Sequence, residues 1–186
     1  MTAAALLRSM VAALNAAGVP FMLTGSLAAA YHGAGRATMD IDLVIDPTPA
    51  QLRALVRSLA GTGAYVSREA AEEALAHRSM FNLVDIATGW KVDLIVRKIR
   101  AFSELEFARR VRANFDGCPL WVASVEDVIV AKLEWAKGGG SARQLEDVAG
   151  LVRIHAGRLD RAYLEHWTAE LGLTAQWDQV IRGERE

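Results

Sequence analysis

The chain has 186 residues, of which 52% are hydrophobic and 23% charged, with four prolines and one cysteine. This composition excludes an intrinsically disordered chain and a small disulfide-stapled scaffold. Lys and Arg number 21 against 22 Asp and Glu, for a net charge of -1. Bulk electrostatic attraction to nucleic acid or to an anionic membrane is therefore not indicated, although a local basic patch stays open.

Targeting signals are the next feature that composition bears on. No run reaches the roughly 18 apolar residues that a membrane helix needs. Arg8 interrupts the apolar N-terminal stretch and no convincing cleavage site follows it, which favours a helix of the folded protein. The single Cys118 cannot form an internal disulfide, which is typical of a reducing compartment. We expect a cytoplasmic protein without a membrane segment.

The first two thirds of the chain predict alternating helices and strands. Apolar residues at helical spacing predict a helix that ends near Ala17, and Ser26 is expected to cap a short second helix. This second helix is expected at about 27–32, and further helices are expected at about 49–59, 68–77 and 102–110. Alternating or continuous apolar runs predict strands at about 19–23, 39–46, 64–67, 80–86, 91–96, 111–115 and 119–123.

The last third predicts helices alone. Ser124 starts a helix that carries Lys132, and after the glycine run at 138–140 Ser141 is expected to cap another. Arg143 and Asp147 lie one turn apart there and are expected to pair. Two more helices follow at about 159–171 and 175–182. The predicted fold class is α+β, a small mixed sheet flanked by helices in residues 1–123, with a helical C-terminal part in residues 124–186 packed on it.

Two aspartates alternate along one predicted strand. Asp40 and Asp42 point to the same face about 6.6 Å apart, close enough to share an ion or to hold adjacent ions. Asp93 is a third charge in an otherwise apolar strand. Carboxylate oxygens suit Mg²⁺ or Mn²⁺, and like charges without a cation are costly. A solvated sheet edge is the alternative, but the apolar neighbours of these residues favour an interior strand.

A small-residue turn precedes the acidic strand. Gly25 and Ser26 at a helix start can offer backbone N–H groups and a hydroxyl to a phosphate. An ordinary turn with a helix cap is the alternative. Arg36 and Thr38 can add a positive charge and a hydroxyl near the same place, unless they belong to a solvated loop.

These residues occur together in an order that resembles a known superfamily. The order is Gly25-Ser26, then Arg36-x-Thr38-x-Asp40-x-Asp42, then Asp93 on a later strand. It is similar to nucleotidyltransferases of the polymerase-beta type, and most similar to the bacterial branch with the AbiEii-type toxins of type IV toxin–antitoxin systems. Resemblance by motif covers about residues 19–96, and extends to the helices through Lys132 and the Arg143-x-x-x-Asp147 pattern.

The resemblance implies a role for each matching residue. Gly25 and Ser26 would hold the triphosphate of an NTP, with Arg36, Thr38 and Lys132 as further nucleotide-binding residues. Asp40 and Asp42 would bind two Mg²⁺ ions. Asp93 would complete the second metal site and help to activate an acceptor hydroxyl. For Lys132, a solvated helix lysine is the alternative. The resemblance also implies that the helical part closes one side of a nucleotide cleft.

The expected function is Mg²⁺-dependent transfer of an NMP to an acceptor, as a toxin of a toxin–antitoxin system or in another role. RNA, protein and small molecules all stay open as acceptors. One alternative is a non-catalytic binding or regulatory protein with the same fold. Another is a divalent-ion site that only stabilises the fold. An antitoxin partner is consistent with the resemblance, and the apolar content and five tryptophans allow a homodimer.

Overall fold

A computed structural model describes residues 2–35, 37–60, 62–139 and 141–183. Arg36, one of the predicted nucleotide-binding residues, lies outside the described residues. The chain forms two compact units, the first from residues 1–24 and 37–123 and the second from residues 25–36 and 124–186. The division expected from the sequence shares the boundary after Ala123, but it assigned residues 25–36 to the first part. That division into domains stays a prediction.

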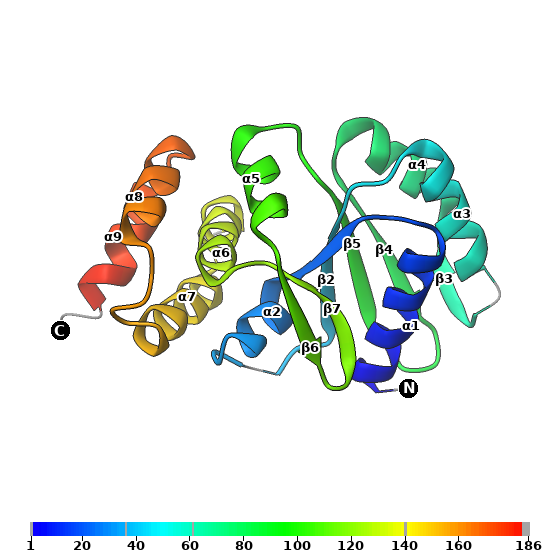
Figure 1. Cartoon of the computed structure of the whole chain (residues 1–186), viewed down its shortest axis with the longest axis horizontal. Coiled ribbons are helices and arrows are strands. Elements are labelled where there is room, and N and C mark those ends of the chain that lie inside the picture. The colour runs from blue at the N-terminus through cyan, green and yellow to red at the C-terminus, as the bar shows by residue number, and fades with distance from the viewer. Residues whose placement is uncertain (1, 36, 61, 140, 184–186) are drawn as a thin grey trace. The chain divides into compact units, whose positions relative to one another are not determined.

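A mixed sheet is the centre of the first unit, as the sequence predicts (Figure 1). Its strands within the described residues run in the order β3-β4-β5-β2-β1-β7-β6. Two neighbouring pairs, β2 with β5 and β1 with β7, are parallel, and the other pairs are antiparallel. The strands are β1 (Phe21–Thr24), β2 (Asp40–Ile45), β3 (Ala64–Val66), β4 (Met80–Asp85), β5 (Lys91–Val96), β6 (Val111–Phe115) and β7 (Cys118–Val122).

Helices cover one face of this sheet, and the side-chain alternation of the strands explains why. Leu23, Leu43 and Leu94 lie side by side on β1, β2 and β5, and all three are fully buried. Helices α1, α3 and α4 lie on one side of the sheet (Figure 1). The helices of this unit are α1 (Ala3–Ala16), α3 (Pro49–Leu59), α4 (Arg68–His77) and α5 (Ala101–Arg109). Thr24, Asp42 and Asp93 lie on the other face of the same strands.

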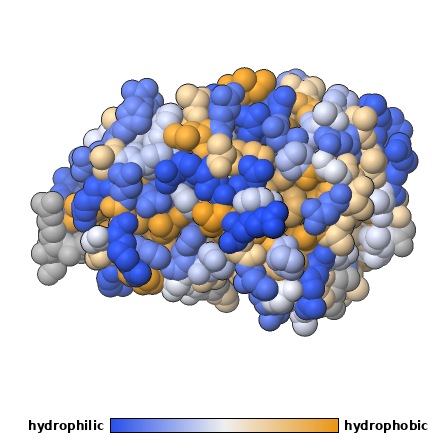
Figure 2. All heavy atoms as spheres, in the orientation of Figure 1, coloured by the Kyte–Doolittle hydropathy of each residue, from blue (hydrophilic) through white to orange (hydrophobic). Residues whose placement is uncertain are grey.

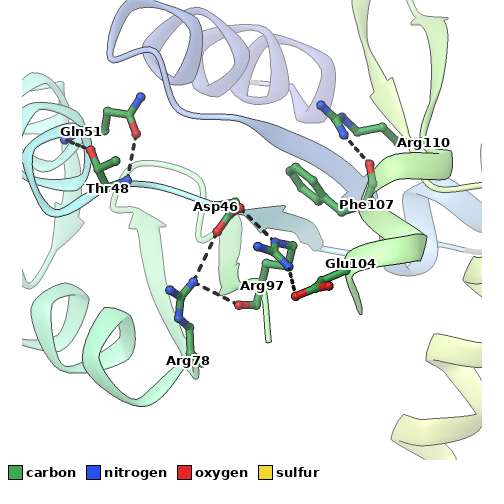
Figure 3. A network of polar contacts seen from close by, with 8 residues as sticks. All are labelled: Asp46, Thr48, Gln51, Arg78, Arg97, Glu104, Phe107 and Arg110. Atoms are coloured by element: carbon green, nitrogen blue, oxygen red, sulfur yellow. Dashed lines mark hydrogen bonds and ion pairs between the residues drawn. The ribbon is translucent and has the colours of Figure 1, made fainter. Parts of the chain in front are cut away.

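An ion-pair network holds the far end of β2 (Figure 3). The Asp46 carboxylate accepts from Arg78 at 3.3 Å and from Arg97 at 3.0 Å, and Arg97 also lies 3.8 Å from Glu104. Asp46 directly follows the strand and is engaged by two guanidinium groups. It belongs to the anchoring of β2, at the opposite end of the strand from Asp40.

The start of α3 allows a test of helix capping (Figure 3). Thr48 accepts from the Gln51 N–H at 3.3 Å, and the Gln51 side chain accepts from the Thr48 N–H at 2.8 Å. Replacing Thr48 by Ala removes one half of this capping box, so we expect a loss of about 1 kcal/mol in the free energy of unfolding, measured by urea denaturation. Ser141→Ala is the matched control. Equal losses in the two variants would contradict the prediction.

Ser141 serves as that control because its hydroxyl makes no capping hydrogen bond, so the predicted side-chain cap is wrong there. The backbone closes the turn instead, with the Gln144 N–H donating to the Ser141 carbonyl at 3.2 Å.

The second unit is helical, as expected for the C-terminal part. Helix α6 packs against α2, α7, α8 and α9, and α7 also packs against α9. The helices are α2 (Gly25–Tyr31), α6 (Val125–Gly139), α7 (Ala142–Ile154), α8 (Arg161–Glu170) and α9 (Thr174–Gly183). Short helix α2 groups with this unit because it contacts α6 and α7.

The outer surface mixes polar and apolar residues. Figure 2 shows hydrophilic and hydrophobic side chains interspersed on the face turned toward the viewer. Among the described residues, no helix combines the length and the apolar character that crossing a membrane requires.

Candidate active site

Polar side chains form a row across four neighbouring strands of the first unit. Asp42 on β2 pairs in register with Asp93 on β5 and with Thr24 on β1, and Asp93 pairs with Asn82 on β4. Neighbouring strands lie about 4.8 Å apart, and register partners point to the same face. The two carboxylates therefore lie side by side, on the face opposite the leucine layer. Asp40 lies two residues before Asp42 on the same face.

Asp93 is the most buried carboxylate of the row. The whole residue is 7% exposed, whereas the Asp40 side chain is 51% exposed. One oxygen of Asp93, Oδ2, lies 3.0 Å from the Lys91 ammonium. The other, Oδ1, is buried and finds no hydrogen-bond donor among the described residues. Because a buried carboxylate oxygen without a donor or cation is unfavourable, Asp93 is suited to receive a further ligand.

Lys91 is a site residue that the sequence reasoning missed. It pairs in register with Asp40, and its Nζ lies 3.7 Å from the Asp40 carboxylate. The hydrogen bond to Asp93, together with the negative charges of Asp93, Asp40 and Asp42, raises the pKa of Lys91, while partial burial opposes the shift. Its position two residues before Asp93 on the same strand was the available signal, because such residues share a face.

Two threonines lie beside the acidic residues. Thr24, which was not predicted, has a buried hydroxyl without a hydrogen-bond partner among the described residues. Thr38, a predicted nucleotide-binding residue, accepts from the Asp40 N–H at 3.1 Å and so fixes the start of β2. That bond shows a local structural role for Thr38, and its contact with a nucleotide stays a prediction.

Gly25 and Ser26 begin the second unit, directly after Thr24. Gly25 has a φ of 64°, a left-handed conformation that strongly favours glycine. Helix α2 starts at Gly25, so Ser26 lies inside its first turn and is buried. Ser26 was expected to cap this helix from the position before it, but the helix already includes Gly25. A role for both residues toward phosphate stays a prediction.

Lys132 lies inside the second unit. Its side chain is 2% exposed, and Nζ donates to Asp147 at 2.7 Å and to Gln144 at 3.0 Å. Asp147 thus pairs with Lys132 of α6, and the predicted pair with Arg143 is wrong. The reason is burial: Lys132 needs a counter-charge inside the unit, whereas Arg143 is exposed to water.

The carboxylates of Asp40, Asp42 and Asp93 are chemically suited to bind a divalent metal, but the described side chains do not form a complete metal site. Hard carboxylate oxygens are the ligands that Mg²⁺ and Mn²⁺ prefer, and none of the described residues donates to the buried Asp93 Oδ1. Even so, in the described part of the chain no three His, Cys, Asp or Glu side chains are gathered closely enough to hold a metal ion. The ammonium of Lys91 instead interacts with Asp40 and Asp93.

Comparison with known proteins decides the family. A family described as "Nucleotidyl transferase AbiEii toxin, Type IV TA system" matches residues 7–179. The chain belongs to this family. The resemblance stated from the sequence is confirmed, and an NTP is the substrate that membership implies for this AbiEii-family chain. No curated protein matches it.

Solved structures with similar folds are nucleotidyltransferases. ANT(2")-Ia in complex with adenylyl-2"-tobramycin is 16% identical, with a TM-score of 0.62 over 90% of this chain and 95% of that one. The lincomycin-bound lincosamide antibiotic adenylyltransferase LnuA is 12% identical, with a TM-score of 0.56 over 83% and 98%. An antigenic nucleotidyltransferase-like protein from Paracoccidioides brasiliensis is 17% identical, with a TM-score of 0.55 over 95% and 92%. At these identities the likeness shows the fold alone.

Proposed function

We propose that this AbiEii-family chain transfers an NMP from an NTP to an acceptor hydroxyl and releases pyrophosphate, in a reaction that depends on Mg²⁺ or Mn²⁺. The observation that carries the proposal is the polar row, in which Asp42 and Asp93 are register partners and Asp93 Oδ1 is buried without a donor from any described residue. Asp40, Asp42 and Asp93 are the proposed metal ligands. A bound divalent ion would supply charge neutralisation on the phosphates and a lower pKa of the acceptor hydroxyl.

The protein's own residues are assigned complementary roles. Asp93 would accept the proton of the acceptor hydroxyl at a carboxylate oxygen, because it is the buried member of the row. Gly25, Ser26, Arg36, Thr38 and Lys132 would bind the triphosphate, as the family resemblance implies.

The biological setting that we propose is that of a cytoplasmic toxin with an antitoxin partner, which is the context of the family. A homodimer is a further proposal, which rests on the apolar content of the sequence. The acceptor is an RNA, a protein or a small molecule bearing a hydroxyl group.

The test is incubation of the protein with each labelled NTP and cell extract, with Mg²⁺ or with EDTA. We expect label from one or more NTPs to appear on a single class of molecule, only with Mg²⁺. Asp42→Asn should abolish the labelling, whereas Asp116→Asn, which removes a carboxylate from the β6–β7 turn, should not. Magnesium-dependent NTP binding by calorimetry without transfer to any acceptor would favour the non-catalytic alternative.

A structural ion site is the second candidate, and one observation favours it. Asp93 Oδ1 is buried and finds no hydrogen-bond donor among the described residues, so an ion bound there could serve the fold alone. In that case Mg²⁺ would raise the melting temperature and a nucleotide would add nothing to the effect.

A further inference from the structure

Lys91 stands where a cation is needed. Its Nζ lies 3.0 Å from Asp93 Oδ2 and 3.7 Å from Asp40 Oδ1, and it contacts carboxylates on two neighbouring strands. Three carboxylates and one ammonium give this part of the sheet a net charge of about -2. A divalent ion bound by Asp40 and Asp93 would compete with the Lys91 ammonium for the same carboxylate oxygens.

The Lys91 side chain can move away from these carboxylates. The Lys91 side chain is 36% exposed, and it stands at the first position of β5. Four rotatable bonds allow the ammonium to move from the carboxylates into water without a change of the backbone. By contrast, the Lys132 side chain is 2% exposed and cannot reach water in this way.

We propose that Lys91 is a built-in counter-ion of the acidic row, that is, of Asp40, Asp42 and Asp93. The lysine stabilises the metal-free protein, and a divalent ion must displace it from Asp93 and Asp40. This inference rests on the proposed function, because it takes these aspartates as metal ligands. The lysine is a positioning residue: it keeps the carboxylates on adjacent strands together before metal binds. It also sets a threshold of metal concentration below which the row stays occupied by the ammonium.

The test compares Mn²⁺ binding, without nucleotide, in the wild type, Lys91→Met and Lys91→Arg by electron paramagnetic resonance. Lys91→Met keeps the length of the side chain and removes its charge, so the Mn²⁺ dissociation constant should fall by about tenfold. Lys91→Arg keeps the charge and should stay within about twofold of the wild type. Asp93→Asn, which removes a proposed ligand, serves as the weak-binding reference.

Melting temperatures provide a second readout. In EDTA, Lys91→Met should melt below the wild type because the carboxylates lose their counter-charge, and saturating Mn²⁺ should close this difference. A lysine with a merely structural role would lower the melting temperature equally with and without Mn²⁺, and that result would overturn the inference.

The binding outcomes separate the two proposals. Equal or weaker Mn²⁺ binding by Lys91→Met, with clear binding by the wild type, would overturn the role of Lys91 and leave the proposed function standing. Absence of Mn²⁺ binding from every variant would instead overturn the metal-dependent function, and the role of Lys91 with it.

Discussion

Asp93→Asn is expected to lower the rate of NMP transfer by roughly 10²- to 10⁴-fold, the range for loss of a general base. The side chain keeps its size but can no longer take a proton from the acceptor, and its charge toward a metal ion is lost. The variant should still fold. Its ion pair to Lys91 is one-third exposed on the lysine side, and such pairs contribute less than about 1 kcal/mol.

Initial rates of label transfer, normalised to folded protein by circular dichroism, measure this effect. The matched control is Asp116→Asn, since Asp116 lies in the β6–β7 turn with a φ of 50°, a conformation that asparagine also adopts. The control should keep the activity of the wild type. Equal activity of Asp93→Asn and the control would remove Asp93 from the reaction.

Lys132→Met is expected to have the largest effect on stability, a loss of about 3 to 5 kcal/mol in the free energy of unfolding. The substitution removes the ammonium that lies 2.7 Å from the Asp147 carboxylate, whose side chain is 8% exposed. Replacing both partners, as Lys132→Met with Asp147→Leu, should recover much of the loss because no buried charge is then left unpaired.

Urea denaturation of the two variants and of Arg68→Met tests this prediction. Arg68 pairs with Glu72 on the surface of α4, with side chains 66% and 46% exposed, so its removal should leave stability unchanged within error. If the double variant is no more stable than Lys132→Met, the loss of stability does not come from the unneutralised Asp147 charge, and the prediction is wrong.

Much of the fold follows from local sequence patterns. The stripe of Leu52, Leu55, Val56 and Leu59 predicted α3 with its correct bounds, because a helical period brings these residues to one face. Alternation along residues 40–45 predicted β2 and the common face of Asp40 and Asp42. These patterns depend on neighbours a few residues apart, so they can be read without knowledge of the rest of the chain.

Errors and omissions arose where the partner comes from another element. Asp147 was expected to pair with Arg143 on its own helix, but it pairs with the buried Lys132 of α6. Thr24 and Lys91 were missed because their places beside Asp42 and Asp40 depend on strand pairing. Strand register links Thr24 to Asp42 and Asp40 to Lys91, which are about twenty and about fifty positions apart in the chain, and no local spacing encodes these links.

The sequence by itself determined the family and the acidic character of the site, through the stretch from Thr24 to Asp46 together with Asp93. Only the tertiary structure decided which groups neutralise that charge. Hydrogen bonding between β2 and β5 aligns Asp42 with Asp93 and sets Lys91 against Asp40, and Asp93 Oδ1 is buried with no donor in the described part of the chain. Charge type is a property of each residue, whereas compensation of charge depends on which strands become neighbours.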